Sequence, residues 1–252
     1  MSSRGLLDCN LSIGHPVVHT YESYGNANEL LESVRPAGID GGIAWHIAQR
    51  DYDPAEGNRM LAKVIEGCGS LWGCWTILPP QTREVITDGF FEQMAMQRVV
   101  ALRAFPDLHR FQLRKSVFGG FLDELAARRI PLMLQIEGNI PWPTVYDLLE
   151  EVPNLTCVLC DIGIAGVDRQ MWPLLERYPN VYVDSSLLSL GEGAMEAMVG
   201  EFSSRRILFG TGFPARYAEA AALQLLHADI SDSDKANIAG ANLRRLISEV
   251  SP

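Results

Sequence analysis

Polar and charged side chains recur where the short apolar runs of this sequence end. The set comprises Asp8, Asn10, His46, Arg103, Gln135, Glu137, Asp161, Asp184 and Ser185. Burying a polar group costs free energy unless it has a partner, so this recurrence predicts that the side chains converge on one site. Carboxylates and a histidine supply acid–base chemistry, and an arginine recognises carboxylate or phosphate groups.

Three of these residues are the candidate catalytic groups. His46 is the only histidine at a predicted strand end and would act as a general acid or base near neutral pH. Asp161 would act as a base, and Arg103 would clamp an anionic group of the substrate. The competing interpretations are a core histidine with one partner and a structural ion pair between Arg103 and Asp161 or Glu137.

A second set of residues is predicted to line the substrate site. Amides, carboxylates and a hydroxyl would orient a small polar substrate, while an aromatic ring after the fifth strand would cover it. His109 lies on the loop that follows the fourth predicted strand. The predicted substrate-binding residues are Asn10, Gln135, Glu137, His109, Asp184, Ser185 and Trp142.

Four of the strand-end residues carry oxygen atoms that could bind a cation. Asp8, Asn10, Asp161 and Asp184 together offer the ligands that Mg²⁺ or Mn²⁺ prefers. We nevertheless expect no metal and no other cofactor, and zinc least of all, because tetrahedral zinc sites need imidazole or thiolate ligands.

These residues must be positioned by a regular alternation of strands and helices. Strands are predicted at residues 5–11, 42–47, 71–78, 99–103, 131–136, 155–161, 181–184 and 206–210. Helices are predicted at residues 26–35, 58–66, 87–96, 118–129, 143–151, 168–177, 193–201, 215–227 and 232–247. Near-continuous apolar strands separated by helices favour a parallel sheet covered on its faces.

Eight strand–helix units over 252 residues give about 31 residues per unit, the size of one repeat of a barrel. The predicted fold class is therefore α/β, a (β/α)8 TIM barrel formed as a single domain by residues 1–252, with one extra C-terminal helix. An open doubly wound sheet is the alternative, but the first strand is not followed by its usual G-x-G-x-x-G loop. In a barrel, the site lies at the carboxyl ends of the strands.

Composition limits the possible partners and compartments. Thirty-one acidic against 21 basic residues offer no basic surface for nucleic acid. No apolar run approaches the length of a membrane span, and the N-terminus does not resemble a secretory signal. We expect a cytoplasmic protein that binds a small-molecule substrate; a homo-oligomer is possible.

Five cysteines, an odd number, favour reduced thiols. Cys157 and Cys160 form a C-x-x-C pattern, but residues three apart on a strand point to opposite faces. They are therefore predicted to pack in the core instead of forming a dithiol pair.

The strand ends make the chain resemble a known family, the amidohydrolase-related (amidohydrolase family 2) hydrolases and decarboxylases, which are metal-dependent TIM barrels. Residues 30–40 resemble the family's LL…GID segment, and residues 178–184 resemble its ypNvyvD strand. Residues 206–214 resemble rvlfGsDfP. Further matches cover residues 131–138, 152–163 and 231–246, with Asn58, Asn242 and Arg245 in the expected places.

The metal ligands that the resemblance implies are missing from this sequence. The His-x-His pair of the first strand is replaced by Asn10 and Ser12, and the histidines of strands five and six by Gln135 and Asp161. Gly212 stands at the position of the eighth-strand aspartate, which the resemblance implies to be the general base.

The resemblance implies an amidohydrolase-like hydrolase, or a related lyase, that acts on a small polar or carboxylate substrate. With the usual metal site lost, its chemistry would be metal-independent or would use an atypical metal. The alternative is a non-catalytic descendant, a small-molecule-binding or regulatory barrel.

Overall fold

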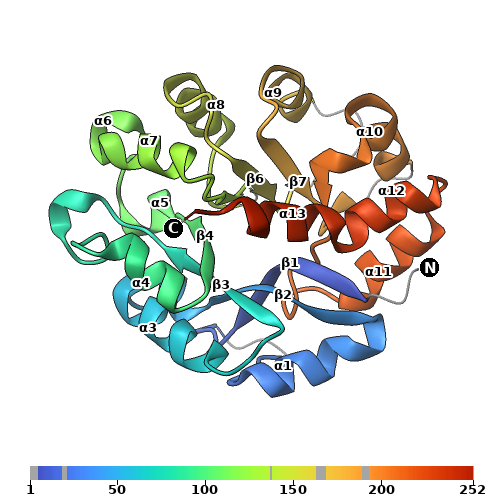
Figure 1. The fold of residues 1–252 in the computed structure, drawn as a ribbon, viewed down its shortest axis with the longest axis horizontal. Coiled ribbons are helices and arrows are strands. Elements are labelled where there is room, and N and C mark those ends of the chain that lie inside the picture. Colours follow the sequence, from blue (N-terminus) through green and yellow to red (C-terminus); the bar gives the residue numbers. More distant parts are fainter. Residues whose placement is uncertain (1–4, 19–21, 137, 163–168, 189–192, 252) are drawn as a thin grey trace.

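Eight parallel strands form the centre of the molecule, in a computed structural model that describes residues 5–18, 22–136, 138–162, 169–188 and 193–251. The strands follow one another in the sheet in chain order (Figure 1). They are β1 (Leu6–Ile13), β2 (Ile39–His46), β3 (Leu71–Thr76), β4 (Val99–Arg103), β5 (Leu132–Gln135), β6 (Cys157–Cys160), β7 (Val181–Asp184) and β8 (Ile207–Leu208).

The sheet closes on itself between its first and last strands. The Cys9 amide donates to the Phe209 carbonyl at 2.9 Å, and the Ser12 amide donates to the Phe213 carbonyl at 2.8 Å. The segment after β8 therefore completes the ring against β1. The predicted (β/α)8 barrel fold is confirmed.

Helices surround the barrel between successive strands (Figure 1). The α-helices are α1 (Ala27–Val34), α2 (Ala48–Asp51), α3 (Pro54–Ile65), α4 (Phe90–Met96), α5 (Pro106–His109), α6 (Lys115–Phe118), α7 (Gly120–Ala127), α8 (Trp142–Glu151), α9 (Met171–Arg177), α10 (Ala194–Phe202), α11 (Ala218–His227), α12 (Asp232–Ala236) and α13 (Asn242–Glu249). Shorter helical turns are η1 (Arg35–Ala37), η2 (Pro80–Thr82), η4 (Ser204–Arg206) and the π-helical η5 (Asn237–Ala241). None of the helices in the described ranges is long and apolar enough to cross a lipid bilayer.

Several boundaries differ from the sequence-based expectation. β2 begins at Ile39, where a turn was predicted. α3 begins at Pro54, four residues early, because Asp53 caps it by accepting from the Glu56 amide at 2.7 Å. The single C-terminal helix predicted over residues 232–247 is wrong, since non-helical Gly240 divides this segment into α12, η5 and α13.

Two apolar layers stabilise the barrel. The larger lies between the sheet and the helices, and the smaller fills the barrel interior, where Ile43, Met133, Val158 and Leu208 meet. Cys157 belongs to the outer layer and Cys160 to the inner one, which confirms that the C-x-x-C residues face opposite ways.

The alternation of inward and outward side chains along β1 changes in the middle of the strand, and this change positions Asn10. Leu7 and Cys9 belong to the interior layer, but Leu11 belongs to the outer one. The pairing with β2 shifts between Asp8 and Leu11, the signature of a bulge. Side chains along β1 therefore do not alternate strictly between the two faces from Asp8 to Ser12.

Buried amides tie helices to strands. Asn58 on α3 accepts from the Thr76 amide and donates to the Thr76 carbonyl, both at 2.9 Å. Asn242, at the start of α13, donates to the carbonyls of Ser204 and Ile207, both at 2.8 Å. These bonds satisfy backbone groups at β3 and β8 that would otherwise be buried without partners.

We predict that two helical glycines respond in opposite ways to alanine. A Cβ at Gly57 of α3 would lie 2.3 Å from the Gln49 amide nitrogen, whereas a Cβ at Gly200 of α10 meets nothing within 4 Å. Gly57→Ala should lower the free energy of unfolding by about 2 kcal/mol through overpacking. Gly200→Ala, the matched control, should raise it by about 0.5–1 kcal/mol. Urea unfolding measures both, and a stabilised Gly57→Ala would contradict the close approach of α2 and α3.

Candidate active site

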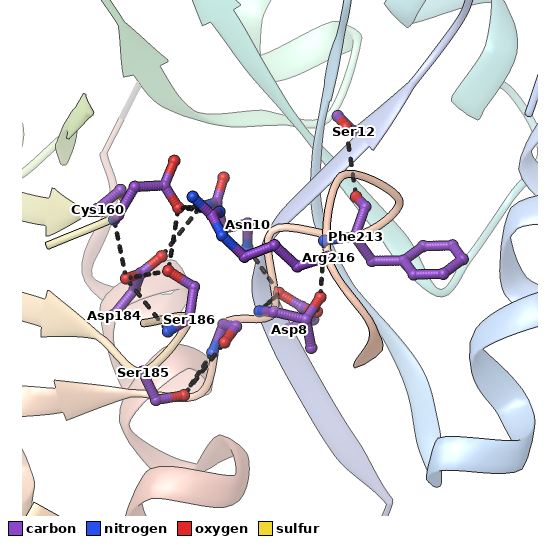
Figure 2. Close-up of polar contacts among 12 residues, drawn as sticks. Asp8, Asn10, Ser12, Cys160, Asp184, Ser185, Ser186, Phe213 and Arg216 are labelled. Atoms are coloured by element: carbon purple, nitrogen blue, oxygen red, sulfur yellow. Dashed lines mark hydrogen bonds and ion pairs between the residues drawn. The ribbon is translucent and has the colours of Figure 1, made fainter. Parts of the chain in front are cut away.

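At the carboxyl end of the barrel, Asn10 bonds to the carboxylates of Asp161 and Asp184 and to Arg103. Its amide nitrogen donates to Asp184 Oδ2 at 2.9 Å and to Asp161 Oδ1 at 3.3 Å. Its amide oxygen accepts from Arg103 Nη2 at 2.7 Å. The bulge in β1 therefore directs Asn10 into the interior, toward Asp184 at the end of β7 (Figure 2).

Asp161 directly follows β6, and its backbone has a left-handed φ of 56°. Its Oδ1 atom accepts from Arg216 Nη1 at 2.8 Å and from Ser186 Oγ at 3.0 Å, in addition to Asn10. Left-handed backbone is costly for a residue with a Cβ and persists where the surroundings hold it. Here the three donors hold the carboxylate in place.

Asp184 ends β7 and is buried next to Asp161. Its Oδ1 atom accepts from the Asp161 amide at 3.2 Å and lies 2.9 Å from Ser186 Oγ. Burial, and secondly the negative charge of Asp161, raise the pKa of Asp184 to about 7. Asp184 therefore changes charge near neutral pH.

The hydroxyl of Ser186 lies within bonding distance of both carboxyl groups, 3.0 Å from Asp161 and 2.9 Å from Asp184. A hydroxyl carries a single proton. Both contacts are hydrogen bonds at once only when one carboxyl group is protonated and donates to the Ser186 oxygen. Arg216 pairs with Asp161, and burial raises the pKa of Asp184, so the protonated form is favoured at Asp184.

Arg216 (Figure 2) lies on the loop between β8 and α11 and reaches the Asp161 carboxylate. The Arg216 side chain is 28% exposed, whereas that of Asp161 is 6% exposed. Gly212 makes room for it: a Cβ there would lie only 2.5 Å from Arg216 Nη1, and its φ of 68° also favours glycine. Gly212, which stands where the family resemblance implies an aspartate, therefore leaves room for the Arg216 guanidinium.

Asp8 fastens the loop after β8 to β1. It accepts from Thr211 Oγ1 at 2.5 Å and from the backbone amides of Thr211 and Asn10 at 3.2 and 2.8 Å. Complete burial outweighs these bonds and raises its pKa to about 6. Ser185 supports the same loop, since its hydroxyl bonds to the carbonyl and the amide of Gly210.

The candidate catalytic residues are only partly brought together. Arg103 is fully buried, stacks over the Trp45 ring at 4.7 Å, and contacts Asn10, whereas Asp161 takes its ion pair from Arg216. The Nε atom of Arg103 has no hydrogen-bond partner among the described residues.

His46 lies at the end of β2 and is also buried. Its Nδ1 atom accepts from the Ala48 amide at 3.1 Å, so the remaining ring nitrogen carries the proton. Burial, and secondly the charge of His15, lower the pKa of His46. Its ring is therefore neutral at physiological pH.

The predicted substrate-binding residues fall into separate places. Asn10, Asp184 and Ser185 belong to the buried network already described. His109, on α5, contacts the Arg50 carbonyl through Nε2 at 3.3 Å, and burial lowers its pKa. Trp142 begins α8 and packs against the outer apolar layer. Glu137 lies outside the described residues.

Gln135 opens onto a cavity of about 510 Å³ at the ends of β4 and β5. This volume suits a small molecule. Gln135 on β5 pairs in register with Cys160 on β6, and Asp161 follows Cys160 directly. The cavity and Asp161 therefore lie at the ends of neighbouring strands. The cavity is lined by Arg50, Asp51, Phe105, Asp107, Leu108, Gln135, Gly138 and Asn139.

These donors do not fit the metal that the family resemblance implies. Among the residues that the structure describes, no three His, Cys, Asp or Glu side chains are arranged to hold a cation. Asn10 turns its NH₂ group toward the carboxylates, and Asp161 Oδ1 already accepts from three donors. Hydrogen-bond donors and a guanidinium thus surround the oxygens that a metal would need.

Sequence reasoning missed Arg216, Ser186 and Thr211, which complete the network. Arg216 fell inside the helix predicted for residues 215–227, whereas α11 begins only at Ala218. The available signal was the position of all three on loops that follow β7 and β8. Such loops carry site residues in barrels.

Comparison with known proteins establishes the family. The profile of the family described as Amidohydrolase matches residues 23–247, most of the chain. The chain therefore belongs to the amidohydrolase family. It is also 29% identical over 105 residues to an acyl-homoserine-lactone synthase of Vibrio anguillarum, in a match that covers 39% of this chain. That match takes in 53% of the relative, so the chain spans about half the length of the curated relative it matches.

Solved structures share the fold at low identity. An amidohydrolase 2 from Bifidobacterium longum subsp. infantis superposes with a TM-score of 0.70 at 17% identity, over 98% of this chain and 99% of that one. A 2,6-dihydroxybenzoate decarboxylase from Rhizobium gives 0.71 at 16% identity, over 97% and 99%. A dihydroxybenzoic acid decarboxylase from a Polaromonas species, with bound manganese and the inhibitor 2-nitroresorcinol, gives 0.68 at 14% identity, over 97% of each chain.

We predict that Asp8 makes stability depend on pH. Its pKa is about 6 in the folded chain against an ordinary value of 3.8, so the native state binds the proton more tightly than the unfolded state. This contribution is fully present below pH 3.8 and is lost as pH rises through about 6. The free energy of unfolding of Asp8→Asn, relative to that of the wild type, should therefore increase between pH 4 and pH 7, by up to about 3 kcal/mol. Urea unfolding at several pH values measures this, and a constant difference would contradict the assignment.

Proposed function

We propose that this chain is a hydrolase, or a related lyase, that acts on a small polar substrate bearing a carboxylate. Its acid–base chemistry would come from the chain's own side chains, without a divalent metal at the strand ends. The observation that carries the proposal is the buried Asp161–Asp184 pair, which shares Asn10 and Ser186 as partners and lies beside Arg216.

The pair is suited to moving one proton. General acid–base catalysis is most effective when the pKa of the group lies near the working pH, and that of Asp184 is raised to about 7. Asp161 would exchange the proton with the substrate, because it contacts the partly exposed Arg216 side chain. Asp184 would hold the proton behind it, with Ser186 between the two.

The cavity beside Gln135 supports the predicted class of substrate. Its lining includes the apolar Phe105 and Leu108 and the polar Gln135, together with Arg50, which pairs with Asp51 at 2.6 Å. A molecule lying there would be one strand away from Asp161, because Gln135 pairs with Cys160, the residue before Asp161. A carboxylate is the group that the Arg50 guanidinium would recognise.

The other sequence candidates take supporting roles in this proposal. Arg103 would position Asn10, because it is buried and bonds to the amide oxygen of that residue. His46 would serve as a neutral hydrogen-bond donor through Nε2, since its Nδ1 atom is already occupied. All five cysteines are free thiols, which supports a reducing compartment such as the cytoplasm.

One observation favours a second function, a barrel that binds a small molecule without turning it over. Asp8, Asp161 and Asp184 are each surrounded by donors from the chain itself. A fully satisfied polar network makes a site rigid and specific. Such a network also serves a barrel that only binds its ligand, so the two functions are separated by turnover and not by affinity.

Turnover tests the proposed function. Protein dialysed against a chelator would be offered carboxylate-bearing amides, esters, lactones and aromatic acids, with product followed by mass spectrometry. We expect turnover of at least one class after metal removal. Asp161→Asn should lower kcat by about 100-fold, the usual contribution of a general acid or base.

Asp123→Asn is the matched control, because Asp123 forms an exposed ion pair with Lys115 at 2.7 Å and should leave kcat unchanged. Activity that disappears with chelation and returns with zinc or manganese would contradict the metal-free chemistry. Carboxylates that raise the melting temperature while no class turns over would favour the binding barrel instead.

A further inference from the structure

Arg216 pairs with Asp161, and it also lies where the family resemblance implies a metal site. The resemblance places one metal ligand at Asp161, after β6, and another at Gly212, after β8. The Arg216 guanidinium lies between these positions, 2.8 Å from Asp161 Oδ1 and 2.5 Å from where a Cβ on Gly212 would stand. A cation of the protein thus occupies the space between the two family ligand positions.

The surrounding side chains are arranged for this cation and not for a metal. Asn10 points its NH₂ group at Asp161 and Asp184, while its oxygen, the atom that a metal would bind, accepts from Arg103. An aspartate at Gly212 would have to displace the guanidinium from its present position, and the φ of 68° also disfavours a side chain there.

Arg216 offers a positive charge that this carboxylate pair favours. Asp161 and Asp184 are buried together, and two adjacent carboxylates cannot both ionise cheaply without a positive group. Asp161 Oδ1 receives Arg216 directly, with the shortest of its three hydrogen bonds. Truncating one partner of a buried charge pair leaves the other uncompensated.

We propose that the Arg216 guanidinium is a fixed cation that takes the place of the family's metal ion, compensating the Asp161–Asp184 pair and excluding a divalent metal. This deepens the proposed function and rests on it for the chemistry, but its test needs no turnover. Arg216 is a positioning residue in this role, because it acts through Asp161.

Thermal unfolding of the full chain at pH 7.5 tests the charge. Arg216→Gln should lower the melting temperature by about 5 °C, since breaking a partly buried ion pair leaves Asp161 uncompensated. Arg216→Lys should recover at least about half of that loss, because it restores the positive charge. Arg177→Gln is the control: Arg177 is exposed and pairs with Glu150 at only 4.0 Å, so its removal should leave the melting temperature unchanged.

Manganese chloride at about 1 mM tests the replacement of the metal. It should raise the melting temperature of Arg216→Gln by about 2 °C or more, because Mn²⁺ prefers the carboxylate oxygens that the guanidinium leaves. The wild type and Arg216→Lys should not respond. Adding Asp161→Asn to Arg216→Gln should abolish the response, which locates the ion at this site.

Two results would overturn the inference. Arg216→Lys no more stable than Arg216→Gln would show that positive charge is not what Arg216 supplies. Manganese that stabilises the wild type as much as Arg216→Gln would show that the guanidinium and a metal do not compete. Should Arg216→Gln fail to fold, calorimetric titration of manganese into the wild type decides: stoichiometric binding abolished by Asp161→Asn contradicts the proposal, and no binding supports it.

Discussion

Two carboxylates buried side by side, Asp161 and Asp184, are the constraint on which the carboxyl end of this barrel depends. Their repulsion in a water-poor interior has to be offset by donors or by a proton. The chain supplies both: Asn10, Ser186 and Arg216 donate, and the pKa of Asp184 rises to about 7 so that one proton stays bound.

The fold delivers each of these groups through a local departure from regular structure. The bulge in β1 turns Asn10 inward, and the left-handed backbone of Asp161 holds its carboxylate at the strand end. The absence of a side chain at Gly212 admits Arg216. A (β/α)8 barrel provides the framework in which loops from distant parts of the sequence meet at one end. The irregular positions then decide the chemistry of that end.

Much of the fold was accessible from sequence because its signals are repetitive. Apolar strands spaced by helices gave the eight units, and segments such as residues 206–214 resembled the amidohydrolase family whose profile matches the chain. Boundaries were harder to predict. The Asp53–Pro54 cap began α3 early, and Gly240 broke a helix whose periodicity suggested continuity.

The site was less predictable because partners are set by tertiary geometry. The sequence pointed to Asp161, Asp184 and Asn10 through their strand-end positions, but it offered Arg103 as a partner for Asp161. In the structure, Arg103 bonds to Asn10 and Arg216 pairs with Asp161. Loop conformation decides which of the two arginines reaches the carboxylate. The sequence predicts the start of a helix at residue 215, where the structure has the loop after β8. The roles of His46, His109 and Trp142 remain predictions.

The central claim is that a guanidinium, not a metal, compensates these carboxylates. A crystal grown with about 10 mM manganese chloride and measured for anomalous scattering at the manganese absorption edge tests it most directly. The account predicts continuous density for Arg216 against Asp161 and no anomalous peak among Asn10, Asp161 and Asp184. A peak coordinated by Asp161, with Arg216 swung away from it, would contradict the account.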